Sequence, residues 1–155
     1  MILLDVLCIS AAADVIQDPN NPNRMLLQGC VNHDTKNIDR SVTITNGFRN
    51  HGNMHFGGAV TITTEFKNHG AIDIDGAVTI TGGCLVNHGA ITFNSHVTIA
   101  HVDGFKNHGR IYFNQGVTVT GNGGRFVNYG IITCRRADVA AAARFASGGG
   151  SVVQQ

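Results

Sequence analysis

The sequence contains no tryptophan, only two prolines and few charged residues. Charged residues make up 14% of the chain and the net charge is +1, so neither a nucleic-acid-binding protein nor a membrane-surface protein is indicated. No apolar run approaches the roughly 18 residues of a membrane-spanning helix. The apolar fraction of 43% favours a folded chain over a disordered one, and 155 residues suffice for one domain with its own core.

The cysteines and the N-terminus give little sign of secretion. The four cysteines have no C-x-x-C spacing, which argues against zinc and redox motifs, and we expect unpaired thiols in a reducing compartment or a closed assembly. Cys30 and Cys134 fall at apolar positions of the repeat described below, where they are expected to act as small core residues. The segment MILLDVLCISAAAD lacks a basic region, and Asp5 interrupts its apolar stretch. The predicted location is therefore the cytoplasm or an assembled particle such as a virion.

Glycine is abundant, with 20 residues, and many of these belong to an internal repeat built on Asn-His-Gly. Successive asparagines of the repeat are 18, 18, 19, 20 and 21 residues apart. A valine follows each of the first five by 10 residues, so all the variation lies in one lengthening segment. A fixed period of this kind is typical of a solenoid, in which each repeat stacks on the next. The repeated asparagines are Asn32, Asn50, Asn68, Asn87, Asn107 and Asn128.

A shorter period of six residues lies within each repeat. Large apolar residues recur at Val42, Phe48, Met54, Val60 and Phe66, and the second residue after each is apolar or asparagine. Alternation of this kind predicts short strands, and glycine at the fifth place of many hexads predicts a bend. Three strands and three bends complete one coil. The sequence therefore predicts an all-β, single-stranded, three-sided parallel β-helix of about six coils of 18–21 residues.

Both ends of this single domain, 1–155, differ from the repeat. Residues 1–24 are expected to form an apolar capping or assembly strand followed by a DPNNPN turn, and residues 25–134 the solenoid coils. Residues 135–155 are expected to form a short helix, with Asp138 as a candidate cap, and a glycine-rich tail, GGGSVVQQ. Exposed strand edges at the ends of a solenoid favour association, so the apolar end residues are candidates for axial contacts. These candidates are Ile2, Leu4, Val6, Val139 and Phe145.

Residues at equivalent positions should form columns along the stack. The asparagine column is expected to point inward at a corner, where its amides can bond to one another and to the backbone. The histidines that follow should form an outward column, which could contribute to a pH-dependent subunit contact or, alternatively, chelate a metal. The histidine column comprises His33, His51, His69, His88 and His108, followed by Tyr129.

Threonine forms two further outward columns in T-x-T pairs, a pattern that resembles the ice-binding face of insect antifreeze solenoids. Ala100 and His96 interrupt the array, and those proteins are secreted and disulfide-bonded. A flat packing face is the alternative, because β-branched threonine suits an outward strand position. The threonines concerned are Thr43, Thr45, Thr61, Thr63, Thr79, Thr81, Thr98, Thr118 and Thr120.

No catalytic constellation emerges from the sequence. Asp73 and Asp75 lie on one outward strand without an evident base or cleft, and the chain has neither a nucleophile elbow nor a P-loop. Hexapeptide-repeat acyltransferases and gamma-type carbonic anhydrases share the 18-residue coil, and some place histidine between subunits. The small residue that follows their aliphatic leader is replaced here by Thr, Arg, Lys or Asp. The prediction is no enzyme, no cofactor, no catalytic residue and no metal site.

Residues 28–134 resemble bactofilins, cytoskeletal β-helices that polymerise end to end, in coil length, size and the lack of a catalytic site. The F-x-N-H-G-x-I phrase also resembles N-x-G-x-I repeats of filamentous adhesins. This resemblance implies a non-enzymatic structural protein that self-assembles into a filament, layer, shell or virion component, with itself as partner. The alternative is a ligand-binding solenoid that takes ice on threonine or metal on histidine.

Overall fold

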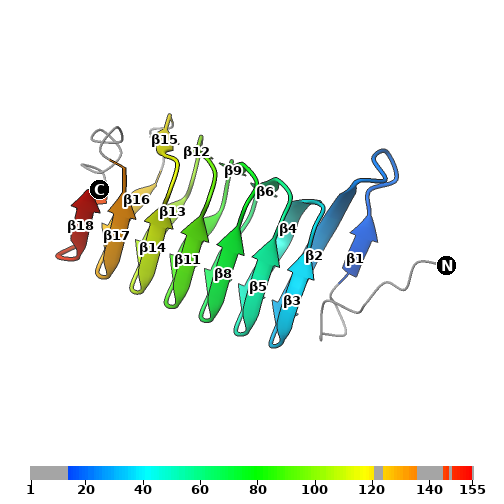
Figure 1. Cartoon of the computed structure of the whole chain (residues 1–155), viewed down its shortest axis with the longest axis horizontal. Coiled ribbons are helices and arrows are strands. Elements are labelled where there is room, and N and C mark those ends of the chain that lie inside the picture. Colours follow the sequence, from blue (N-terminus) through cyan, green and yellow to red (C-terminus); the bar gives the residue numbers. More distant parts are fainter. Residues whose placement is uncertain (1–13, 121–123, 136–144, 147, 155) are drawn as a thin grey trace.

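The chain forms a stack of short strands, which a computed structural model describes for residues 14–120, 124–135, 145, 146 and 148–154. The described part is an all-β parallel solenoid of about six coils, as the sequence predicts, and it contains essentially no helix. Strands of successive coils lie side by side along the long axis, and β1 and β18 lie at opposite ends of it (Figure 1).

Each coil contributes strands to three faces, which we number in chain order. Face 1 carries the VTI strands and face 2 the strands that end in the repeated asparagine. In the first two coils one long strand, β2 (Arg24–Asn32) or β4 (Ser41–Asn50), runs across both faces. Face 1 continues with β6 (Val60–Ile62), β9 (Val78–Ile80), β12 (Val97–Ile99) and β15 (Val117–Val119). Face 2 continues with β7 (Phe66–Asn68), β10 (Cys84–Asn87), β13 (Gly104–Asn107) and β16 (Arg125–Asn128).

Face 3 is a separate seven-stranded sheet whose strands all run parallel. Its strands are β3 (Thr35–Ile38), β5 (Asn53–Phe56), β8 (Ala71–Ile74), β11 (Ala90–Phe93), β14 (Arg110–Phe113), β17 (Ile131–Cys134) and β18 (Ser151–Gln154). Register is kept through the whole sheet, so each residue pairs with its equivalent one coil away. Because the register is constant, residues at the same position of the repeat form columns along the stack.

The core consists of the inward residues of the three faces, buried in continuous columns. Phe48 stacks on Phe66 at 5.2 Å between ring centroids, and Phe93 on Phe113 at 5.1 Å. A single coil cannot bury its own apolar side chains. They are covered by the neighbouring coils and by the side chains of the opposite faces. The alternation of buried and partly exposed residues in Val60–Ile62 and Ala71–Ile74 is the pattern expected for strands with one side inward.

Glycine in Asn-His-Gly allows the coils to approach closely at one corner. A Cβ atom on Gly70 would lie 1.9 Å from the carbonyl oxygen of Gly52, the equivalent residue one coil earlier. Any larger residue would therefore push adjacent coils apart. At another corner Asn46 and Gly47 adopt φ values of 62° and 92°, which lets β4 turn from face 1 to face 2 without ending.

The described N-terminal end of the chain is a hairpin. The DPNNPN segment forms a turn, in which the Asn21 N–H donates to the Asp18 carbonyl at 3.1 Å. That turn joins β1 (Asp14–Gln17) to β2 in an antiparallel pair at the edge of face 1. Six residues are too few for a parallel crossover but suit a hairpin connection. The candidates Ile2, Leu4 and Val6 lie outside the described residues.

The C-terminal end also differs from the expected helix and tail. The predicted helix falls mainly on residues 136–144, which lie outside the described part, as does Val139. The predicted tail instead forms β18, which pairs in parallel with β17 and adds a further rung to face 3. Phe145, expected as an axial contact, is 1% exposed and packs against the rings of Phe105, Phe113 and Phe126. It closes the core of its own chain and so is not available to another.

The cysteines correct a further expectation. Cys30 is disulfide-bonded, so the prediction of four unpaired thiols is wrong. Cys84 is a partly buried thiol at the start of β10, and Cys134 is buried on face 3 at the position of Phe113. Cys30 and Cys134 do occupy the apolar core columns, each 1% exposed.

Candidate functional site

The six repeated asparagines line the inside of the corner between faces 2 and 3, and each is at most 2% exposed. Each Nδ2 donates to the Oδ1 of the next asparagine along the stack, at 2.7–2.9 Å, from Asn32 through to Asn128. The same Nδ2 also donates to the carbonyl two residues later, for example Asn68 to Gly70 at 3.0 Å. Burial of these amides is therefore compensated, and the column holds the corner of the solenoid together.

The histidine column lies on the outside of the same corner and is exposed to solvent. Neighbouring imidazole rings are 4.7–4.9 Å apart and within 5–8° of parallel, and Tyr129 continues the stack beyond His108. Parallel rings present their nitrogens in the same direction, so they do not converge on one point as metal ligands do. The pKa of His69 is lowered by partial desolvation first, then by His51 and His88, and finally by Lys67 and Arg49.

The threonine columns on face 1 form a less continuous hydroxyl surface than the sequence suggests. Thr43 is buried and accepts hydrogen bonds from the Arg24 guanidinium, whose Nε lies 2.7 Å away. Thr63 donates its hydroxyl to the Ile44 carbonyl, one coil earlier, at 3.1 Å, and Thr81 donates in the same way to Ile62. The remaining members vary in accessibility: Thr61, Thr79, Thr98 and Thr45 are partly buried, whereas Thr118 and Thr120 are exposed.

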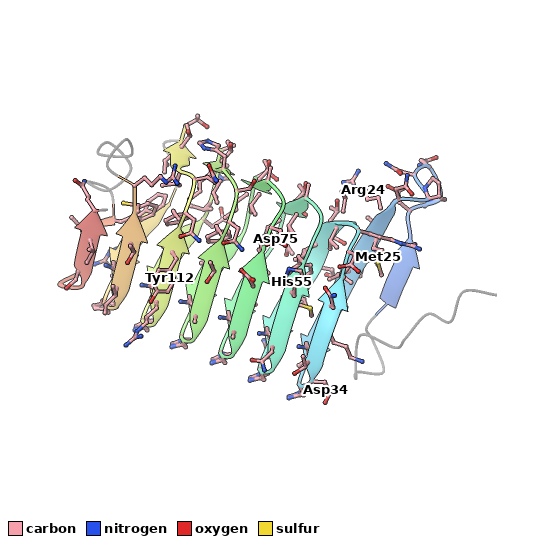
Figure 2. The ribbon with its side chains drawn as sticks, viewed as in Figure 1. Arg24, Met25, Asp34, His55, Asp75 and Tyr112 are labelled. Atoms are coloured by element: carbon pink, nitrogen blue, oxygen red, sulfur yellow. The ribbon has the colours of Figure 1, made fainter. Side chains whose placement is uncertain are left out.

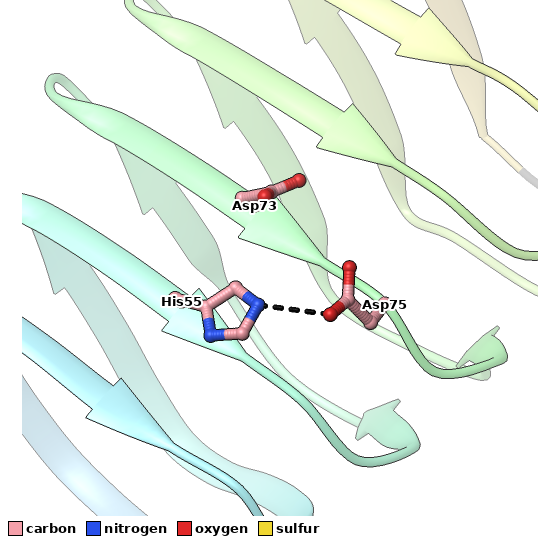
Figure 3. Close-up of side chains that lie close together, drawn as sticks. All are labelled: His55, Asp73 and Asp75. Atoms are coloured by element: carbon pink, nitrogen blue, oxygen red, sulfur yellow. Dashed lines mark hydrogen bonds and ion pairs between the residues drawn. The ribbon is translucent and has the colours of Figure 1, made fainter.

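Face 3 carries a cluster of ionisable residues that the sequence reasoning did not assemble. His55 on β5 lies beside Asp73 on β8 and Asp75 just after it, with one ligand atom of each within 4.8 Å of the others (Figure 3). The His55 Nε2 is 3.0 Å from the Asp75 Oδ2. His55, Asp75 and Tyr112 lie along the same outward side of the sheet (Figure 2). Asp73 and Asp75 therefore do have a potential base beside them, contrary to the expectation.

The coil period contains the signal that would have found this partner. His55 precedes Asp73 by 18 residues and pairs with it in the register between β5 and β8. The two residues consequently share one outward column, which continues through Thr92 and Tyr112.

Three asparagines support the cluster from neighbouring coils. Asn37 places its Oδ1 2.6 Å from the His55 Nδ1. Asn94 donates its Nδ2 to Asp73 at 2.8 Å and to Asp75 at 2.9 Å, and it accepts a hydrogen bond from Asn114 at 2.8 Å. These contacts lower the pKa of the Asp75 carboxyl, with the Asn94 hydrogen bond as the main cause and His55 second, against a small opposing effect of desolvation.

A hollow of about 490 Å³ lies over this part of face 3. Its lining includes His55, Asp73 and Asn94 of the cluster, together with Lys36 and Thr92. The hollow supplies the concave surface that the sequence analysis did not expect beside the two aspartates. Ionisable side chains and a recess therefore coincide on this part of face 3.

No helix in the described part of the chain is long and apolar enough to cross a membrane. Comparison of the chain with protein-family models, with curated proteins and with solved structures finds no match. No family match therefore supports the resemblance to bactofilins specifically. What the structure itself establishes is the architecture, and on that ground the chain is a parallel β-solenoid repeat protein of about six turns.

Proposed function

We propose that this protein is a non-enzymatic structural protein whose copies associate end to end through the two edges of face 3. The observation that carries the proposal is the matching register of its terminal strands. Consecutive pairings connect Ser151 of β18 through Ile131, Arg110, Ala90, Ala71 and Asn53 to Thr35 of β3. A second copy that continues the stack would thus place its Thr35 opposite Ser151 of the first, in the same parallel register.

Both edges offer backbone groups for such pairing. Within the described residues β3 pairs only with β5, and β18 only with β17. The Asn53 N–H donates backwards to the Asp34 carbonyl, so the equivalent N–H of Thr35, one coil earlier, points out of the chain. An unpaired parallel edge is a template for a further strand.

Exposed apolar side chains near the C-terminal edge support the same contact. Ile131 on β17 and Val153 on β18 are 39% and 45% exposed, and Tyr129, two residues before Ile131, is 55% exposed. Burial of such residues against another copy is favourable by roughly 25 cal/mol per Å². At the N-terminal end, by contrast, the β1 hairpin occupies part of the face 1 edge, so the joint would use mainly face 3.

Two polar residues limit the strength of this joint. Lys36 stands at the inward position that Met54 and Ile72 occupy in later coils, and Gln154 at the position of Cys134 and Phe113. Inward-pointing polar residues are a common way to weaken an edge strand. We therefore expect association that is reversible and requires high protein concentration.

The proposal can be tested with substitutions on β3 and β18 that are expected to strengthen or to abolish the association. The double variant Lys36→Met, Gln154→Phe restores column residues at both ends and should lower the concentration for assembly at least about tenfold, which is 1.4 kcal/mol. Thr35→Pro removes the outward N–H and should abolish assembly. Lys106→Met, an exposed change on face 2, is the matched control and should have no effect.

Sedimentation velocity and negative-stain electron microscopy would measure the outcome. Rods of width equal to one solenoid in the double variant, absent with Thr35→Pro, would support the proposal. A monodisperse monomer of the double variant at hundreds of micromolar would refute it. Oligomers that persist unchanged with Thr35→Pro would refute it as well, because the contact would then lie elsewhere.

A further inference from the structure

The cluster of His55, Asp73 and Asp75 has the geometry of a metal site, independently of how copies of the chain associate. Three donors, one imidazole nitrogen and two carboxylates, come together from adjacent coils on an exposed face (Figure 3). The side chains of His55 and Asp75 are 36% and 52% exposed, so an ion in solution can reach both.

The spacing of the first two donors suits a bound ion. Two ligands at 2.0–2.2 Å from a tetrahedral zinc ion are roughly 3.3–3.6 Å apart. The His55 Nε2 and the Asp75 Oδ2 are 3.0 Å apart, and an Asp73 oxygen lies within 4.8 Å of both. Small rotations of these side chains are therefore enough for all three donors to reach one ion.

The neighbours of the cluster orient it as outer partners of a metal site do. Asn37 Oδ1 lies 2.6 Å from the His55 Nδ1 and so holds the ring with its Nε2 towards Asp75. Asn94 binds both carboxylates through Nδ2, and Asn114 orients Asn94 in turn. Hydrogen bonds to the distal nitrogen of a ligating histidine and to ligating carboxylates are the usual second layer of support.

The two carboxylates also favour a cation by their charge. They are held close together by the Asn94 amide, and the single positive charge of Lys36 in the lining of the hollow does not balance both of them. The hollow leaves space for water to complete the coordination. One nitrogen and two carboxylate donors with open positions suit borderline divalent ions more than the hard Mg²⁺ and Ca²⁺ ions, which prefer oxygen alone.

We propose that His55, Asp73 and Asp75 bind one divalent transition-metal ion of the zinc class, with water in the remaining positions. Because His55 belongs to β5 and the aspartates to β8 and its end, the ion links two consecutive coils. Binding to the folded state alone raises its stability with metal concentration. The site thus adds a metal-dependent link to a stack otherwise held by hydrogen bonds and core packing.

The test uses Zn²⁺ alone as the probe, with calorimetry at pH 7 and thermal unfolding of the full chain. One Zn²⁺ per chain and a melting temperature that rises with metal are expected. His55→Thr, which introduces the residue found at Thr92 in the same column, should lower the affinity by on the order of 100-fold, and the double variant Asp73→Asn, Asp75→Asn at least as much. His69→Gln in the exposed histidine column is the matched control and should leave affinity unchanged.

Cobalt absorption spectra give a second readout that does not depend on stability. Visible d–d bands of bound Co²⁺ should disappear with His55→Thr and persist with His69→Gln. Binding that survives His55→Thr, or that is lost with His69→Gln, would overturn the assignment, the second by placing the ion on the histidine column. Absence of any Zn²⁺ binding up to about 100 µM would overturn it too. None of these outcomes depends on whether the chain self-associates.

Discussion

The Nδ2 of Asn50 donates a hydrogen bond to the Oδ1 of Asn68 at 2.9 Å, in the interior of the solenoid, and both side chains are 0% exposed. Asn68 in turn donates to Asn87 at 2.9 Å. The column is therefore directional, since every amide accepts from the coil before and donates to the coil after. Loss of one member removes a donor and an acceptor at once.

Replacement of Asn68 by aspartate should destabilise the protein strongly. A carboxylate cannot donate to the three acceptors that Asn68 now satisfies, the Gly70 and Ala90 carbonyls and the Asn87 amide. An uncompensated buried charge costs about 3–5 kcal/mol. Urea unfolding would measure the loss. Asn53→Asp, the same change at an exposed position, should stay within about 0.5 kcal/mol. A loss under 1 kcal/mol in Asn68→Asp would contradict the structural role of the column.

Alanine at Gly70 should separate adjacent coils. Its Cβ would lie 1.9 Å from the Gly52 carbonyl oxygen, and backbone cannot move aside as a flexible side chain can. We expect a loss of at least about 3 kcal/mol, at the upper end of overpacking effects. Gly104→Ala is the matched control, because there the nearest atom is the Cys84 Sγ at 3.4 Å. Equal free energies of unfolding for the two variants would show that the corner tolerates expansion.

The exposed histidine column should make stability decrease in mild acid. Since the pKa of folded His69 lies below the ordinary 6.5, the unfolded chain binds a proton first as pH falls. The contribution of His69 is fully present above pH 6.5 and is lost as pH falls below that value. Because the ring is exposed, the effect should be under about 1 kcal/mol.

Nuclear magnetic resonance titration would measure this directly. The His69 ring should titrate below pH 6.5, and Lys67→Gln or Arg49→Gln should raise its pKa by removing a nearby positive charge. Urea midpoints at pH 7.5 and 5.5 should differ less in His69→Gln than in the unmodified protein. A His69 pKa above 6.5 would exclude this account of the column.

Phe145 should contribute strongly to stability although it lies outside the repeat. Its ring is 5.1 Å from Phe105 and 5.6 Å from Phe126, measured between centroids, at the C-terminal end of the core. Phe145→Ala removes this cover and should cost about 3–5 kcal/mol in urea unfolding. Tyr129→Ala, which removes an exposed ring of similar size, should cost less than about 1 kcal/mol. Similar losses in the two variants would mean that Phe145 does not close the core.

Much of the fold could be predicted from the sequence because, in a solenoid, residues one repeat apart lie at equivalent positions of adjacent coils. The six-residue apolar period predicted the strands, and the repeat length predicted the number of coils. Where the period ends, the sequence does not specify the strand pairing. β1 forms a hairpin with β2, and the tail containing Val152 pairs with β17. Both choices depend on which free edge is available, which is a property of the finished stack.

The candidate metal site shows the same division. The columns follow from the repeat, since His55 and Asp73 are one period apart and side chains alternate along a strand. The turn of His55 towards Asp75, at 3.0 Å, and the binding of both carboxylates by Asn94 of the next coil became evident only in the folded chain. A column constrains where a Cβ atom lies, whereas the direction of a side chain depends on its hydrogen-bond partners in the neighbouring coils.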